Sequence, residues 1–130
     1  MKKYIIAGGR DFETTENFDY MVECITPILY DDEIRGVEFI SGGANGADKL
    51  GEMFYKLASA TKRLGQIPQK LSIFNADWNT YGKSAGPIRN EQMAKYADAC
   101  IVFWDGKSKG AKNMIDNAIK HRLELHIFFY

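Results

Sequence analysis

The sequence predicts an α/β domain with a parallel sheet, because short apolar runs alternate with longer amphipathic segments along the chain. With 130 residues, the chain is long enough for one compact domain and too short to expect two. Each run is almost continuously hydrophobic, as expected for strands buried on both faces. Five runs are expected to form strands, at residues 4–7, 37–40, 71–74, 100–104 and 125–129.

The first two helices are expected after the first two strands. Apolar residues recur every three or four positions after Thr14 or Thr15, either of which is a suitable N-cap. Pro27 interrupts this pattern and predicts a kink or an early end to the helix. The second helix is expected to begin near Asn45 and to continue towards Leu64.

Two further helices and one long loop complete the alternation. Pro87 is preorganised for a first helical position, so the third helix is expected from there to about Tyr96. The fourth is expected after a Ser108 cap. Residues 76–86 have no clear periodicity, and a long irregular loop in a compact domain is often functional.

Strand and helix thus alternate four times before a closing strand, which predicts right-handed crossovers and a three-layer, Rossmann-like domain spanning residues 1–130. The expected strand order is 3-2-1-4-5. In such a sheet the first and fourth strands flank the topological switch point, so a ligand is expected beyond their carboxyl ends.

The composition excludes several classes of protein. Seventeen basic residues balance seventeen acidic ones, so no overall charge favours nucleic acid or an anionic membrane, and both are unlikely partners. No apolar stretch approaches the length of a membrane span, and no metal-ligand spacing is present. Cys24 and Cys100 lie in apolar stretches and are interpreted as buried thiols of a cytoplasmic protein.

The predicted topology gathers four unusual loops at the carboxyl edge of the sheet. Each follows one of the first four strands, and together they hold most of the glycines and polar residues that could contact a ligand. They are GGRDF (8–12), SGGANGAD (41–48), DWNTYGKSAGPIRN (77–90) and WDGKSKG (104–110).

SGGANGAD has two interpretations. Small residues and a following helix N-terminus favour the approach of a phosphate or another anion. Alternatively, the glycines form a tight turn, which Asn45 and Asp48 cap. The ligand-binding candidates in this loop and in the preceding GGRDF loop are Gly8, Gly9, Arg10, Ser41, Gly42, Gly43, Gly46 and Asp48.

Two arginines are candidates for binding an anion. The guanidinium of Arg10 could clamp a phosphate, or it could pair with Asp11 at the surface. Arg89 and Asn90 lie in the first turn of a helix, where a cation opposes the helix dipole. That placement suggests an anionic partner for Arg89, although solvent tolerates it at small cost.

The remaining candidates lie on the third and fourth loops. Trp78 and Tyr81 could stack on a base while Lys83 approaches a phosphate. Alternatively, these aromatic residues pack the loop onto the sheet, an interpretation that suits Trp78 better than Tyr81. Asp105 could accept hydrogen bonds from ribose hydroxyls, or it could be an ordinary turn residue. The other ligand-binding candidates here are Gly86, Gly106, Ser108 and Gly110.

No catalytic constellation stands out by residue type. His121 and His126 are expected outside the site, and neither cysteine has a histidine close in sequence. Carboxylates near the predicted edge are the only candidates for acid/base chemistry, namely Asp11, Asp48, Asp77 and Asp105.

GGRDF, SGGANGAD, DWNTYGKSAGPIRNEQM and ADACIVFWDGKSKG, followed by an amphipathic helix, resemble the YspA-like branch of the SLOG superfamily over nearly the whole chain. That superfamily also contains the Lonely Guy phosphoribohydrolases, DprA and molybdenum-cofactor carrier proteins. The resemblance implies a Rossmann-like domain that binds a nucleotide or a nucleotide-derived ligand, with no further cofactor. It also implies a possible homo-oligomer.

The sequence departs from the Lonely Guy enzymes at their catalytic motif. Their PGGxGTxxE motif ends in a glutamate, and Met114 occupies the corresponding position here. Two hypotheses follow. The first is a module that senses, carries or sequesters a nucleotide-derived ligand. The second is a hydrolase of a nucleotide N-glycosidic or phosphate bond, in which Asp48 or Asp105 replaces the glutamate and Arg89 or Arg10 stabilises negative charge.

Overall fold

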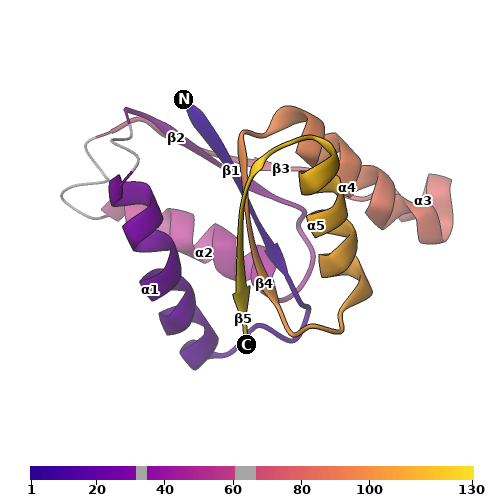
Figure 1. The fold of residues 1–130 in the computed structure, drawn as a ribbon, viewed down its shortest axis with the longest axis horizontal. Coiled ribbons are helices and arrows are strands. Elements are labelled where there is room, and N and C mark those ends of the chain that lie inside the picture. The colour runs from indigo at the N-terminus through magenta and orange to yellow at the C-terminus, as the bar shows by residue number, and fades with distance from the viewer. Residues whose placement is uncertain (32–34, 61–66) are drawn as a thin grey trace.

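Five strands form one parallel sheet in the order β3-β2-β1-β4-β5, so the predicted fold class and strand order are confirmed (Figure 1). The structure is a computed structural model that describes residues 1–31, 35–60 and 67–130. Every strand pair is parallel, and β1 lies at the centre between β2 and β4. The strands are β1 (Lys2–Gly8), β2 (Val37–Ser41), β3 (Gln69–Ile73), β4 (Ala99–Trp104) and β5 (Glu124–Phe129).

Helices cover both faces of the sheet and make three layers (Figure 1). One face carries α1 and α2, and the other carries α4 and α5. None of the described helices combines the length and apolarity needed to cross a lipid bilayer. The helical elements are α1 (Thr15–Asp31), α2 (Ala47–Ala60), α3 (Trp78–Tyr81), the 3₁₀ turn η2 (Gly82–Ser84), α4 (Ala85–Tyr96) and α5 (Lys109–Lys120).

The pleat of the central strand divides the core between the two faces. Tyr4 and Ile6 of β1 pack in the cluster beneath α1 and α2, whereas Ile5 and Ala7 pack in the cluster beneath α4 and α5. Because β1 has a helical layer on each side, it must be apolar at successive positions. This explains the continuous hydrophobicity seen in the sequence.

The helix caps largely follow the predictions. Thr14 Oγ1 accepts a hydrogen bond from the Asn17 N–H at 3.0 Å and so caps α1. Ser108 Oγ accepts from the Ala111 N–H at 3.3 Å and caps α5, as expected. The second helix begins at Ala47, later than expected, and its predicted continuation to Leu64 lies outside the described residues.

The predicted early end at Pro27 is wrong, because α1 continues through it to Asp31. Proline in a helix interior costs about 3 kcal/mol. Met21, Ile25 and Leu29 are buried on the inner face of the helix on both sides of the proline. Their burial against the sheet outweighs the lost hydrogen bond, since tertiary packing supplies most of the stability of a helix in a protein.

The segment 76–86 is more regular than predicted. It contains α3 and η2, which lead directly into α4 at Ala85. Asp77 starts α3 by accepting a hydrogen bond from the Thr80 N–H at 3.1 Å. Pro87 therefore occupies the third position of α4 and not the first. It is tolerated there because the first N–H groups of a helix have no intrahelical partner.

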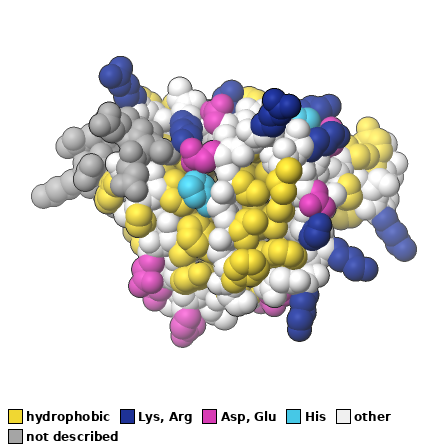
Figure 2. Space-filling view, in the orientation of Figure 1, with side chains coloured by type: hydrophobic (Ala, Val, Ile, Leu, Met, Phe, Trp, Pro, Cys, Tyr) yellow, Lys and Arg dark blue, Asp and Glu magenta, His cyan; other side chains and the backbone are white. Residues whose placement is uncertain are grey.

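β5 is an edge strand of the sheet and leaves apolar surface uncovered. Figure 2 shows hydrophobic side chains gathered over the middle of the face on which β5 and α5 lie in Figure 1. Phe129 of β5 and Ile119 of α5 are among the exposed large hydrophobic residues.

We predict that Phe103→Ala lowers the free energy of unfolding by about 3 to 5 kcal/mol, because it leaves a cavity inside an aromatic stack. Phe103 is fully buried, and its ring lies 4.7 Å from that of Phe12 and 5.6 Å from that of Phe128. Urea denaturation measures the loss. Ile119→Ala is the control, because this exposed side chain is expected to change stability by no more than about 0.5 kcal/mol. Equal losses in the two variants would contradict the assignment of the core.

Candidate functional site

Two adjoining cavities lie beyond the carboxyl ends of the strands, where the sequence predicts a ligand. Their volumes are about 530 and 580 Å³, and both are lined by Arg10, Ala44, Trp78 and Arg89. The first cavity lies at the switch point between β1 and β4, and the second lies over the loop after β2. A ligand could therefore occupy either cavity or extend across both.

Most of the predicted ligand-binding residues line these cavities, but several do not. Those in the first cavity are Gly8, Arg10, Asp48, Gly86, Arg89, Asn90, Asp105, Ser108 and Gly110. The second cavity adds Gly42 and Gly43. The residues that line neither are Gly9, Ser41, Gly46, Tyr81, Lys83 and Gly106.

The glycines of the 41–48 loop lie close to other parts of the protein. A Cβ atom on Gly42 would lie 2.5 Å from Arg89 Nη1, and one on Gly43 would lie 2.8 Å from Asn75 Oδ1. Gly46 has a φ of +83°, and a Cβ there would lie 2.3 Å from the Gly9 carbonyl oxygen. The missing side chains thus make room for neighbouring protein atoms, while Gly42 and Gly43 still line the second cavity.

Ser41 also serves the loop itself. Its hydroxyl donates to the Glu52 carboxylate at 2.7 Å and accepts from the Gly43 N–H at 3.0 Å. Because the side chain is buried and both contacts are internal, Ser41 is a positioning residue for the loop and is not exposed to a ligand.

Arg89 joins this loop to α4. Only 9% of the residue is exposed, and its guanidinium donates from Nη1 to the Gly42 carbonyl oxygen and from Nε to Asn90 Oδ1 at 2.9 Å. Asp48 lies close enough to stabilise its charge. Arg89 lines both cavities, although two of its five N–H groups already donate within the protein.

Asp48 is a buried carboxyl group with a shifted pKa. It is 6% exposed and accepts a hydrogen bond from the Ala44 N–H at 3.2 Å. Burial raises its pKa from 3.8 to about 6, although the charge of Arg89 and the Ala44 hydrogen bond act in the opposite direction. A carboxyl group with this pKa in a cavity wall can exchange a proton near neutral pH.

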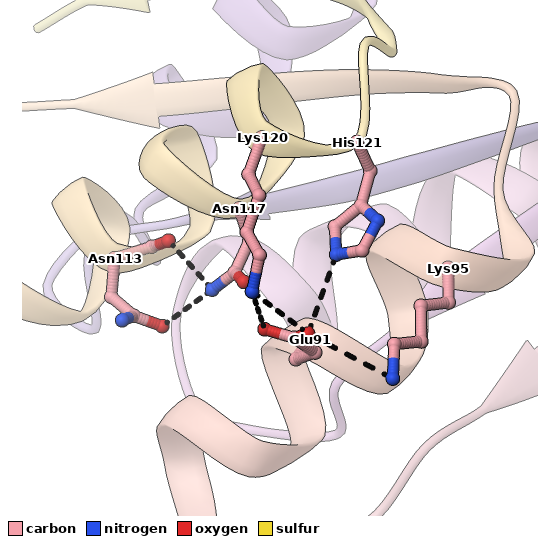
Figure 3. Close-up of polar contacts among 6 residues, drawn as sticks. All are labelled: Glu91, Lys95, Asn113, Asn117, Lys120 and His121. Carbon is pink, nitrogen blue, oxygen red and sulfur yellow. Dashed lines mark hydrogen bonds and ion pairs between the residues drawn. The ribbon is translucent and has the colours of Figure 1, made fainter.

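A chain of amides connects Arg89 to α5. Asn90 Nδ2 donates to Asn113 Oδ1 at 2.9 Å, and Asn117 Nδ2 donates to the same oxygen at 3.1 Å. Asn117 Nδ2 also donates to the Asn113 carbonyl oxygen at 3.0 Å (Figure 3). Asn113 lines the first cavity, and sequence reasoning did not identify it because no motif marks it.

An ion-pair cluster beside these amides holds α4 against α5 (Figure 3). Both Glu91 carboxylate oxygens accept from Lys120 Nζ at 3.1 Å. His121 Nε2 and Lys95 Nζ lie 3.5 and 3.8 Å from the same carboxylate. The hydrogen bond from Lys120 is the main cause that lowers the pKa of Glu91, and His121 and Lys95 act in the same direction. The cluster is outside both cavities and fixes the wall that contains Asn113.

The 8–12 loop presents Arg10 to both cavities. Asp11 does not pair with it, because Asp11 Oδ1 accepts a hydrogen bond from the Tyr130 hydroxyl at 2.5 Å. Burial raises the pKa of Tyr130, and this hydrogen bond raises it further. No hydrogen bond or ion pair joins the Arg10 guanidinium to another residue within the described ranges. The guanidinium is therefore available to a ligand.

The N-terminus of α5 forms the opposite wall of the first cavity. Asp105 Oδ1 accepts from the N–H groups of Lys107 and Ser108, both at 2.8 Å, and these bonds lower its pKa. It acts here as a turn residue. A Cβ on Gly110 would meet nothing within 4 Å, so this position is open towards the cavity that it lines.

Trp78, and not Tyr81, is the aromatic residue at the cavities. Both side chains are half exposed, but only Trp78 contributes to the lining. Lys83 lies away from the cavities with Tyr81, and Lys109 at the start of α5 lines the first one instead. The sequence places aromatic and basic residues in the right loops but cannot show which way each one faces.

The other reactive side chains contribute nothing to the site. Cys100 is fully buried, which raises the pKa of its thiol, and Cys24 is partly buried. Within the described ranges, no group of histidine, cysteine, aspartate and glutamate side chains could hold a metal ion.

The fold and these cavities define a Rossmann-like α/β protein with a ligand-sized site at the carboxyl edge of a parallel sheet. Over 122 residues, the chain is 28% identical to the Gene 61 protein of Mycobacterium phage D29, in an alignment that covers 92% of this chain and 90% of that protein. No protein-family model and no solved structure matches the chain. The name of the phage protein states no activity, so this similarity favours no particular function.

We predict that the free energy of unfolding of the wild-type protein falls, relative to that of the Asp48→Asn variant, as the pH rises from about 4 to about 6. The raised pKa means that the folded state binds this proton more tightly than the unfolded state does. Asp48 therefore stabilises the folded state fully at a pH below its pKa in the unfolded chain. This stabilisation is lost as the pH rises through the pKa of Asp48 in the folded protein. The expected change is about 2 to 3 kcal/mol.

Urea denaturation at several pH values between 4 and 7 measures this difference. A constant gap between the two proteins over that range would show that Asp48 titrates normally in the folded state.

Proposed function

We propose that the protein binds a nucleotide or a nucleotide-derived ligand at the carboxyl edge of the sheet. The observation that carries the proposal is an asymmetry among the charged groups of the first cavity. The carboxylates of Asp11, Asp48 and Asp105 all accept hydrogen bonds from the protein. Arg10 and Lys109, in contrast, have no such partner within the described ranges. The cavity is thus suited to an anion.

The N-terminus of α5 strengthens this preference. Its partial positive charge and its first N–H groups favour a phosphate, and Gly110 leaves room for one to approach. Ser108 caps the helix and holds this end in place.

Apolar and aromatic groups provide a surface for a base. Trp78 lines both cavities and is half exposed, so its ring is available for stacking. Met93 and Met114 add apolar lining to the first cavity. A ligand that combines phosphate with a flat heterocycle matches both kinds of surface. The resemblance to the SLOG superfamily supports the same class of ligand.

A hydrolase of a nucleotide bond is the second candidate, and one observation favours it. Asp48 lines the first cavity with a pKa of about 6, which suits a general acid or base. Asp105 is less suitable, because its pKa is lowered and its carboxylate is held in a turn. Met114 cannot transfer a proton, so the Lonely Guy mechanism does not apply unchanged. The cytoplasmic location and the homo-oligomer remain predictions.

We predict that Arg10→Ala weakens the binding of nucleoside monophosphates by about 1.5 to 3 kcal/mol, the value of a hydrogen bond to a charged group. Calorimetry with a panel of nucleotides measures the effect. Arg35→Ala is the matched control, because Arg35 is an exposed arginine that precedes β2 at the opposite edge of the sheet. If the wild-type protein binds no nucleotide, or if both variants bind equally well, the proposed site is wrong.

We also predict that the wild-type protein returns bound nucleotides unchanged after incubation, which chromatography and mass spectrometry can follow. Turnover in the wild-type protein that is abolished by Asp48→Asn would instead establish the hydrolase. Turnover that survives in Asp48→Asn would exclude Asp48 as its acid or base.

A further inference from the structure

We propose that Asn113 selects the base of the bound nucleotide by donating a hydrogen bond to an exocyclic carbonyl oxygen. This inference rests on the function proposed above and adds the class of base, a 6-oxopurine or a 4-oxopyrimidine. Asn113 is half-buried, lines the first cavity and belongs to no motif that the sequence revealed.

The orientation of the Asn113 amide is fixed from one side by Arg89. A guanidinium can only donate hydrogen bonds, so the Asn90 atom that faces Arg89 Nε must be the oxygen. The amide nitrogen of Asn90 then faces Asn113 at 2.9 Å, and the Asn113 atom that accepts from it must also be the oxygen.

The same orientation follows independently from the other side. The Asn113 backbone carbonyl can only accept, so the Asn117 atom at 3.0 Å from it must be the amide nitrogen. That nitrogen also lies 3.1 Å from the Asn113 side chain, which must again present its oxygen. A guanidinium, which can only donate, and a backbone carbonyl, which can only accept, therefore impose the same orientation on the Asn113 amide.

The Asn113 amide nitrogen is therefore a hydrogen-bond donor that has no acceptor within the described ranges. It points away from Asn117 in Figure 3. An exocyclic amino group next to this nitrogen would form no hydrogen bond with it, because both groups are donors. A carbonyl oxygen would accept a hydrogen bond from it, whereas an amino group would displace solvent from it without supplying an acceptor.

The position of Asn113 separates it from the groups that suit a phosphate. Along α5, Asn113 lies about 4.5 Å beyond Gly110, at a rise of 1.5 Å per residue. Lys109 and Gly110 provide the end of the cavity that favours an anion, whereas Met93 of α4 and Met114 of α5 contribute apolar lining to the same cavity. The neutral part of a nucleotide fits beside Asn113.

Calorimetric titration of matched pairs of nucleotides tests the inference. Inosine monophosphate is compared with adenosine monophosphate, and uridine monophosphate with cytidine monophosphate. The wild-type protein is expected to bind the oxo member of each pair about tenfold more tightly, the effect of one satisfied hydrogen bond. In Asn113→Ala this ratio is expected to fall to about one. Asn113→Asp, which replaces the donor with acceptors, is expected to reverse it.

The ratio within each pair separates recognition from structure and from overall charge. A general loss of anion affinity in Asn113→Asp affects both members of a pair and leaves their ratio unchanged. Asn75→Asp makes the same substitution in the second cavity and is expected to retain the wild-type ratio. Asn113→Asp should remain folded, because its carboxylate can still accept from Asn90 and Asn117. Circular dichroism checks this.

The possible outcomes test base selection by Asn113 separately from nucleotide binding. If the wild-type protein binds nucleotides but the ratios are unchanged in both Asn113 variants, base selection by Asn113 is wrong and nucleotide binding stands. A changed ratio in Asn75→Asp would place the base in the second cavity and would also overturn the inference. If the wild-type protein binds no nucleotide, both fall together.

Discussion

Arg89 carries a positive charge that is largely buried, and the geometry of the site depends on how that charge is accommodated. Burial lowers its pKa, and the nearby carboxylate of Asp48 opposes that shift. Its hydrogen bond to the Gly42 carbonyl ties the loop after β2 to α4, and its hydrogen bond to Asn90 fixes the orientation of that side chain within α4. Removing Arg89 or Asp48 would leave the other charge buried without a partner, so the stability of each depends on the other.

From Arg89, ordered contacts extend to the other walls of the site. The amide chain through Asn90 and Asn113 reaches α5, and the ion pairs of Glu91 hold the same two helices together outside the cavity. On the other side, the Ala47 N–H donates to the Gly9 carbonyl oxygen at 3.1 Å, which joins the loops after β1 and β2. Carboxylates and amides are thus largely used within the protein, while Arg10 and Lys109 remain for a ligand.

The strands and their order could be predicted from the sequence because burial on both faces requires continuous apolar runs such as 100–104. The edge at which the cavities lie followed from that order. Side-chain direction could not be predicted, since it depends on contacts between distant segments. Tyr81 therefore looked more suitable than Trp78, and Asn113 was not identified. Gly42 and Gly46 suggested space for a ligand, but a side chain at these positions would meet Arg89 and the 8–12 loop.

The close contact between the loops after β1 and β2 restricts how relatives of this protein can diverge. A side chain at Gly46 would collide with the backbone of the neighbouring loop, so a larger residue there requires that loop to move as well. The segment from Trp78 to Ser84, in contrast, has no buried residue, although it begins with the aromatic side chain that lines both cavities. New ligand preferences could therefore arise by substitutions or insertions in this segment while the remainder of the site is inherited intact.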